Sequence, residues 1–410
     1  MTETAKLPID EFVEYLLVLG GDLLSFGCPT HRLEDVIRVV SRIEGYHAEV
    51  FAVPTGLFLS VAPAEGGTPL FRMIRVKEWG VNLERLAGAD RIFNEVIEHK
   101  CTLREALDRL HALENKPPPY PFWLRWLAGA AATGAAAVFF RGGPWEVLVA
   151  AFGGLVLGLF NPVAAKNPQA RLLADFVGGL FAASLAAACT WIRFDLSREV
   201  IVLATVIVNV PGMTLTTGLQ ELATKNLVSG ASRLMEAMII FLSILFGIAL
   251  IVGIGEMVNT PILAAAPRVG MGLPVQVAAI VIASLAFGVL FSMPRRFLHL
   301  ALLSGGVGWI ATALGTRYLP GHLAAFTSAL TLSLVANAFA RVTARPSQLF
   351  LLPGLILLVP GSFGFLSLEE FLRGDFMGGA SKGFEMFLIA GALVTGLLVA
   401  NVVLPARKIL

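Results

Sequence analysis

The sequence is poor in the residues that build metal and redox centres. Its 410 residues include three cysteines (Cys28, Cys101 and Cys189) and six histidines, and neither type shows metal-binding or redox spacing. The glycine patterns of nucleotide-binding loops, G-x-x-x-x-G-K-S/T and G-x-G-x-x-G, are also missing. We therefore expect no metal, no cofactor and no ATP-driven step.

Charge is scarce in most of the chain. Residues 1–120 carry 13 Lys and Arg and 18 Asp and Glu, a net charge of −5 (13 − 18), whereas residues 121–410 carry 18 and 11, a net charge of +7 (18 − 11). Spans of about 20 apolar residues fill the second part, as bilayer-crossing helices require. This pattern predicts an acidic soluble domain followed by a polytopic membrane protein, without nucleic-acid binding.

The first apolar stretch does not look like a secretory signal. Phe12 to Phe26 is interrupted by Glu14 and Asp22 and lacks a basic start. We therefore expect a multi-pass protein of the cell (inner or plasma) membrane whose N-terminus lies in the cytoplasm and whose membrane part contacts lipid.

The periodicity of residues 1–118 predicts a small α+β cytosolic domain in the order ααβββαα. The expected helices and strands are Ile9–Phe26, a helix from Pro29, His47–Val53, Gly56–Ala62, Pro69–Val76, Leu83–His99 and Thr102–Glu114. A proline-rich linker, Lys116 to Pro121, joins this domain to the membrane part. The domain shows no nucleophile–base pair, so we do not expect an enzyme.

The stretch from Gly27 to Glu34 has two interpretations. Pro29 fits the first turn of a helix, with Arg32 and Glu34 in solvent. Alternatively, Arg32 and Glu34 form a polar patch that contacts a ligand or the inner gate of the membrane part.

The membrane part contains an internal repeat. Val210 to Gly247 aligns without a gap with Val359 to Gly396, 149 residues later, and both copies carry Val-Pro-Gly, a Glu and Gly-Ala-Ser. We expect ten spans in two five-helix halves, 119–260 and 261–410. Because five is odd, the second half should be inverted in the membrane, as in many secondary transporters. The expected spans are roughly 122–140, 145–163, 172–190, 199–217, 234–254, 274–293, 297–315, 322–340, 347–366 and 384–404.

Each repeat contains a Pro-Gly pair within an apolar helix. Proline removes a backbone donor, and the broken helix frees backbone groups at membrane depth that can bind a zwitterionic ligand. A simple structural kink is the alternative. Polar residues cluster at the first break, which favours a lined cavity. The predicted substrate-binding residues are Asn209, Pro211, Gly212, Thr214, Thr217, Glu221, Pro360, Gly361 and Ser362.

Three carboxylates are candidates for carrying a proton. Asp175 stands near the start of the third span, where an interfacial carboxylate is the alternative. Glu236 and Glu385 stand at equivalent repeat positions, but each follows a cation by three residues, so an i,i+3 ion pair with Arg233 or Lys382 competes with a functional role. Arg233 is also a candidate gating residue.

These motifs together resemble the threonine/serine exporter family over essentially the whole chain. The likeness rests on Gly27-x-Pro29-Thr30-x-Arg32-Leu33-Glu34 in the front, on Pro211-Gly212 to Arg233-Leu234, and on Val359-Pro360-Gly361-Ser362 to Gly379. Glu221 departs from the Asp that this family more often has. The resemblance implies efflux of threonine and serine driven by the proton motive force, with ten spans and a cytosolic N-terminus.

Other interpretations of the function stay open. The same fold could export dicarboxylates, peptides or another small metabolite, with the front domain sensing a cytosolic compound. The sequence predicts a small-molecule substrate and protons as partners. It leaves open whether the protein forms a homo-oligomer.

Overall fold

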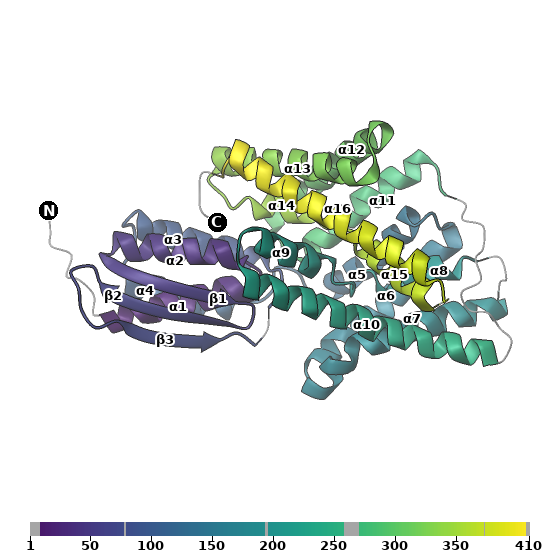
Figure 1. The fold of residues 1–410 in the computed structure, drawn as a ribbon, viewed down its shortest axis with the longest axis horizontal. Helices are drawn as coiled ribbons and strands as arrows, with labels where there is room; N and C mark the ends of the chain where they lie inside the picture. Colours follow the sequence, from purple (N-terminus) through teal and green to yellow (C-terminus); the bar gives the residue numbers. More distant parts are fainter. Residues whose placement is uncertain (1–8, 78, 193–195, 258–269, 373, 407–410) are drawn as a thin grey trace.

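The computed structural model describes residues 9–77, 79–192, 196–257, 270–372 and 374–406. Seven elements from Ile9 to Glu114, here called the N-terminal unit, lie at one end of a bundle of long helices (Figure 1). The chain is mostly helical, and its sheet is confined to the N-terminal unit among the described residues. This confirms a mostly α-helical protein with a small α+β part at its N-terminus.

The N-terminal unit packs α1 and α2 against a three-stranded antiparallel sheet in the order β1-β2-β3, and α3 and α4 pack on α1. Val53 pairs with Gly56 at the tight β1–β2 turn, and alternate β1 residues are buried beneath α2. Thr102 and Glu105 form a capping box that begins α4. The elements are α1 (Ile9–Ser25), α2 (Thr30–Ile43), β1 (Tyr46–Val53), β2 (Gly56–Pro63), β3 (Leu70–Arg75), α3 (Leu83–Ile97) and α4 (Leu103–Glu114). The predicted order ααβββαα is therefore confirmed.

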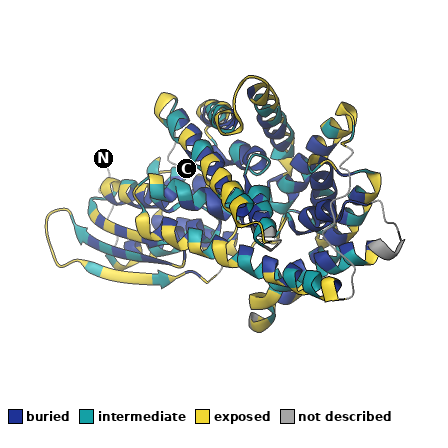
Figure 2. Cartoon of the chain, turned by 45° about the vertical axis from the view of Figure 1, so that its right-hand side comes forward, coloured by how far each residue is buried: buried dark blue, intermediate teal, exposed yellow. Residues whose placement is uncertain are grey.

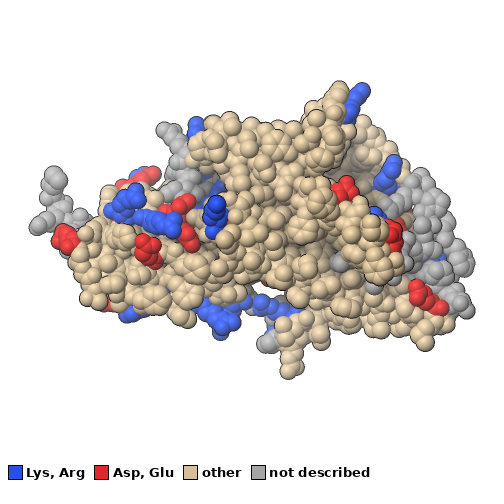
Figure 3. Space-filling model, in the orientation of Figure 1, with Lys and Arg blue, Asp and Glu red and all other residues tan. Residues whose placement is uncertain are grey.

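Eight helices in the described part of the chain are long and apolar enough to cross a membrane. Their outward faces expose large apolar side chains such as Leu172, Phe246 and Val342, whereas their inward faces are buried (Figure 2). Charged side chains gather over the N-terminal unit and towards the opposite end, with a broad uncharged band between them (Figure 3). An apolar belt of this kind suits lipid contact. The helices are α5 (Phe122–Phe139), α6 (Pro144–Ala165), α7 (Pro168–Ile192), α10 (Leu227–Met257), α11 (Leu273–Leu290), α12 (Leu298–Tyr318, preceded by the 3₁₀ turn Arg295–Phe297), α13 (Gly321–Thr343) and α16 (Phe376–Val403).

Two further segments are split at the Pro-Gly pairs. The chain forms α8 (Arg198–Val206) and α9 (Gly212–Ala223) around the first pair, and α14 (Gln348–Leu355) and α15 (Gly361–Leu372) around the second. Each piece is too short to cross a bilayer alone. This is why eight long helices are found where the sequence predicts ten spans.

Equivalent glycines make equivalent contacts in the two halves. A Cβ added to Gly247 on α10 would lie 2.1 Å from the carbonyl oxygen of Phe176 on α7, and one added to Gly396 on α16 would lie 2.6 Å from that of Phe326 on α13. These positions are aligned in the sequence repeat. Only glycine permits such close helix packing, so the duplication is visible in the three-dimensional contacts.

We predict that Gly247→Ala and Gly396→Ala each destabilise the protein by about 1–3 kcal/mol, because a methyl group would overlap backbone of the facing helix. The measurement is thermal unfolding of the purified full chain in detergent. Gly253→Ala on α10 and Gly391→Ala on α16 are matched controls, because nothing lies within 4 Å of a Cβ at either position. Equal melting temperatures for tests and controls would contradict the packing argument.

Candidate functional site

The two Pro-Gly breaks meet at the centre of the bundle. A Cβ added to Gly212 would lie 2.5 Å from Val359 Cγ1, and one added to Gly361 would lie 2.7 Å from Val210 Cγ1 and 3.6 Å from Gly212 Cα. The first helical turns of α9 and α15 therefore begin next to each other. Unpaired backbone N–H groups at helix starts form an electropositive region that attracts anionic groups.

Two cavities flank this contact. One, of about 220 Å³, is lined by residues of both breaks and by apolar side chains of α5 and α11, and includes Gly212, Gly361 and Ser362. The other, of about 50 Å³, lies between the breaks and the N-terminal unit and is lined by Thr217 and Gln220 together with Pro29, Arg32 and Trp79. Of the other predicted binding residues, Pro211, Thr214 and Pro360 are buried at the breaks.

Asn209 lies in a different place from Thr217. Its side chain accepts a hydrogen bond from Asn161 Nδ2 at 3.3 Å and lies near Asp175 of α7. Asn209 and Asn161 line a third cavity of about 250 Å³ between α5, α6 and α8. The predicted site residues thus fall into two groups, one at the meeting breaks and one polar chain that leads through Asn209 to Asp175.

Glu221 is the most completely engaged of the predicted residues. Its carboxylate is fully buried at the end of α9. Oε1 accepts hydrogen bonds from the backbone N–H and the hydroxyl of Thr30, both at 3.1 Å, and Oε2 accepts from Ser229 Oγ at 2.6 Å and from Arg233 Nε at 3.1 Å. Thr30 is the first residue of α2, so a membrane-helix carboxylate caps a helix of the N-terminal unit.

Trp79 extends the same contact. The Arg233 side chain is 2% exposed, and its guanidinium lies 4.6 Å from the centre of the Trp79 ring. Trp79 Nε1 donates a hydrogen bond of 3.1 Å to Glu236 Oε1. Stacking a desolvated guanidinium on an indole ring contributes up to about 2 kcal/mol. Arg233 and Glu236 therefore both bind the N-terminal unit.

The two residues of the predicted polar patch, Arg32 and Glu34, contact different parts of the protein. Arg32 Nη1 donates to Ser347 Oγ at 3.3 Å, immediately before α14. Glu34 instead accepts from the backbone N–H of Ala52 at 3.2 Å and from Arg38 Nη2 at 3.1 Å, inside the N-terminal unit. Arg32 thus faces the membrane helices, and Glu34 ties α2 to β1.

The i,i+3 ion pairs considered from the sequence are wrong. Arg233 pairs with Glu221 and Lys382 pairs with Glu370, twelve residues earlier in each repeat. Both partners stand at equivalent positions because each short helix after a break packs along the following long helix. Glu385 is exposed on the surface of α16.

Two titratable groups at the start of α2, Cys28 just before the helix and His31 in its first turn, border the contact with the membrane helices. Burial raises the pKa of the Cys28 thiol to about 12, so this cysteine stays protonated. Burial, together with the adjacent Arg32 guanidinium, lowers the pKa of His31 from about 6.5 to about 4. A neutral His31 is therefore part of the folded arrangement at neutral pH.

Sequence reasoning missed Thr30 and Trp79 as contact residues. Thr30 stands inside the stretch from Gly27 to Glu34, but a threonine at the start of a predicted helix is ordinarily read as a helix cap. Trp79 lies in a short connection after β3, and a lone tryptophan between Glu78 and Gly80 carries no pattern. Only the docking of the two parts brings both residues to α9 and α10.

Two family models match most of the chain. A threonine/serine exporter model matches residues 14–255, and a second model, described as "Threonine/Serine exporter, ThrE", matches residues 276–403. The chain belongs to the threonine/serine exporter family. The matched residues cover most of the N-terminal unit and both halves of the bundle.

Curated relatives are fungal membrane proteins. The pheromone-regulated membrane protein 10 of Yarrowia lipolytica is 25% identical over 248 residues, which is 58% of this chain and 20% of that protein. The proteins of the same name from Debaryomyces hansenii and Kluyveromyces lactis are each 27% identical, and the match covers 24% and 25% of their lengths. The chain thus spans a quarter or less of the length of these three relatives. No solved structure matches.

We predict that Glu221→Gln destabilises the protein by about 3–5 kcal/mol, because it leaves the Arg233 charge buried without its carboxylate. Glu370→Gln is the matched control at the equivalent repeat position. Its pair with Lys382 is partly exposed, so its loss should cost about 1 kcal/mol or less. Thermal unfolding of the full chain in detergent compares the two variants, and equal losses would contradict the assigned contacts.

A second prediction concerns pH. Because the folded-state pKa of His31 lies below its unfolded value, its contribution to stability is present above about pH 6.5 and is lost as pH falls towards 4. The protection of the α2 amides from hydrogen exchange in the full chain, measured against the intrinsic exchange rate at each pH, should therefore fall over this interval. His31→Gln should flatten the dependence, whereas His47→Gln, at an exposed position on β1, should leave it unchanged. The same pH profile in all three proteins would refute the role of His31.

Proposed function

We propose that the protein is a secondary exporter of small hydroxy amino acids, threonine and serine, driven by the proton motive force across the cell membrane. The observation that carries this proposal is the meeting of the two Pro-Gly breaks, with the starts of α9 and α15 side by side and a cavity on either side. Broken helices that meet at the centre of a repeat are typical of transporter substrate sites.

The proposed topology is ten spans in two inverted halves, 119–260 and 261–410, behind a cytosolic domain of residues 1–118. Each split pair, α8 with α9 and α14 with α15, serves as one span. The N-terminal unit contacts the end of α9 through Glu221 but the start of α14 through Ser347, and α15 lies at the far end of the bundle (Figure 1). The N-terminal unit thus contacts the last part of the split pair α8–α9 but the first part of the equivalent pair α14–α15. Two inverted halves would present opposite ends of equivalent elements on the same side of the membrane in this way.

The proposed substrate site lies at the breaks. The positive ends of α9 and α15 would attract the substrate carboxylate, and free carbonyl groups before each break would accept from its ammonium. Thr217 and Ser362, on the two sides of the contact between Gly212 and Gly361, are suited to hydrogen-bonding a side-chain hydroxyl. Passage of substrate would then require the two breaks to separate.

The N-terminal unit is proposed to act as the inner gate. Arg32 and Trp79 help to close the small cavity below the breaks, and Arg233 and Glu221 hold the unit against α9 and α10. Opening towards the cytoplasm would require these contacts to loosen. Partial weakening of these contacts should raise the rate of substrate exchange. Their complete loss should uncouple substrate exchange from the proton gradient.

Asp175, Glu236 and Glu385 remain the proposed proton carriers. Asp175 is linked to the first break through Asn209, and Glu236 is linked to the gate through Trp79. Protonation of either carboxylate would weaken a polar contact that joins moving parts. Glu385, which is exposed, has the weakest support of the three.

The test is counterflow of labelled threonine in proteoliposomes, with and without an imposed pH gradient. We predict gradient-dependent uptake by the wild-type chain, and exchange that no longer responds to the gradient in the variant lacking the proton carrier. Asp175→Asn and Glu236→Gln are the main variants, and Glu385→Gln is the third. Unchanged gradient responses in all three would exclude these carboxylates from coupling.

The cargo is tested by the same experiment. Absence of threonine and serine exchange would reject the proposed substrates and leave another small metabolite, a dicarboxylate or a peptide, as the cargo. A screen of labelled metabolites in the same proteoliposomes would then identify it.

A further inference from the structure

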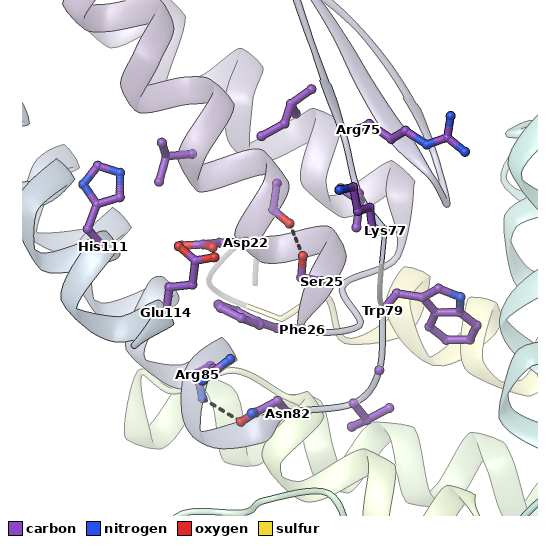
Figure 4. A pocket seen from close by; sticks show the side chains of 16 residues that line it. Asp22, Ser25, Phe26, Arg75, Lys77, Trp79, Asn82, Arg85, His111 and Glu114 are labelled. Atoms are coloured by element: carbon purple, nitrogen blue, oxygen red, sulfur yellow. Dashed lines mark hydrogen bonds between the residues drawn. The ribbon is translucent and has the colours of Figure 1, made fainter. Parts of the chain in front are cut away.

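A large, open cavity of the N-terminal unit lies outside the proposed transport path. It has a volume of about 760 Å³ and is bordered by α1, the chain after β3, the start of α3 and the end of α4 (Figure 4). Cavities of a few hundred Å³ that combine apolar walls with a few polar groups are the usual form of small-molecule sites. Neither the transport proposal nor the fold accounts for this space.

Asp22 is the unusual residue of this cavity. It stands in the middle of α1, is 8% exposed, and its Oδ2 atom is buried without a hydrogen-bond partner in the described part of the chain. A buried carboxylate oxygen without a donor costs free energy that an alanine or leucine at this helix position would avoid. A ligand that donates to Asp22 would offset that cost.

The neighbours of Asp22 define the charge of the ligand. Glu114, at the end of α4, faces Asp22, and burial followed by the Glu114 charge raises the pKa of Asp22 to about 7. Arg85 opposes this rise, but its guanidinium also donates to the carbonyl oxygen of Lys116 at 3.1 Å and lies 5.7 Å from the Phe26 ring centre. Two facing carboxylates with one engaged arginine favour a bound cation.

The other walls supply the complementary chemistry. Lys77, on the chain after β3, faces the cavity across from Asp22, and Phe26, Val18 and Ile74 provide apolar surface (Figure 4). A carboxylate on one side and an ammonium on the other match a molecule that carries both charges. Among the described residues, no group of three His, Cys, Asp or Glu side chains is placed to hold a metal ion, so an organic cation fits better.

We propose that this cavity is a regulatory binding site for a free amino acid or short peptide, with the ligand ammonium on Asp22 and Glu114 and its carboxylate towards Lys77. The site is separate from the transport path. It borders the docking contact directly, because Trp79 lines this cavity and also contacts Arg233 and Glu236 of α10. Occupancy of the cavity and docking of the N-terminal unit therefore share one side chain.

The test is hydrogen exchange of the full chain in nanodiscs, titrated with L-threonine and threonyl-threonine, with N-acetyl-threonine as the probe that lacks an ammonium. At least one of the first two should slow exchange in α1 and α4, and the acetylated probe should not. Asp22→Asn should raise the ligand concentration needed for this protection about tenfold or more, since a charged hydrogen bond to the ligand is lost. Glu49→Gln, at an exposed position on β1, is the matched control.

The outcomes separate this proposal from the transport proposal. Protection confined to the bundle, or equal protection by the acetylated probe, would overturn the proposed site whatever the counterflow result. Protection of α1 and α4 that is lost in Asp22→Asn would support it even if threonine is not transported. Thermal unfolding of Asp22→Asn, expected to match or exceed that of the wild type, shows that the variant is folded.

Discussion

The buried carboxylate of Glu221 is the interaction on which the arrangement of the two parts depends. It accepts four hydrogen bonds, two from Thr30 at the start of α2 and two from Ser229 and Arg233 of α10. A charge removed from water is tolerated only when it is paired and hydrogen-bonded. The N-terminal unit supplies half of these donors, so undocking would leave the carboxylate undersatisfied. The docked arrangement is therefore stable, and a partly undocked one costs free energy. This suits a unit that is either docked or undocked, with no stable state between.

The same pairing occurs in the second repeat, but in a different environment. Lys382 and Glu370 reproduce Arg233 and Glu221 in sequence position, yet they lie partly exposed and have no N-terminal unit against them. Duplication thus produced two equivalent ion pairs, one of which has been used to hold the N-terminal unit. An arginine at the buried position is chemically reasonable, because its guanidinium can pair with the carboxylate and stack on Trp79 at once. The lysine at the exposed position has only a carboxylate to bind.

Much of the fold follows from local patterns. Alternating burial in β1, the tight turn between β1 and β2 and the capping box of α4 act within a few residues, and all were predictable. The apolar runs predicted the long helices, and the repeated Pro-Gly pairs predicted the two breaks. The sequence left open an i,i+3 ion pair of Arg233 with Glu236, which helical spacing allows, but this is not the pair that forms. The fold instead brings Glu221 close, from a separate helix that packs along α10.

The sequence by itself determined which elements form, that the membrane part is duplicated, and which residues stand at its breaks. Those properties depend on periodicity, proline chemistry and the alignment of one half with the other. Only the tertiary structure decided that the breaks of the two halves touch, that Asn209 joins Asp175 rather than Thr217, and that Thr30 and Trp79 meet α9 and α10. These contacts join residues far apart in the chain, and they arise from packing between whole elements, which no local pattern records.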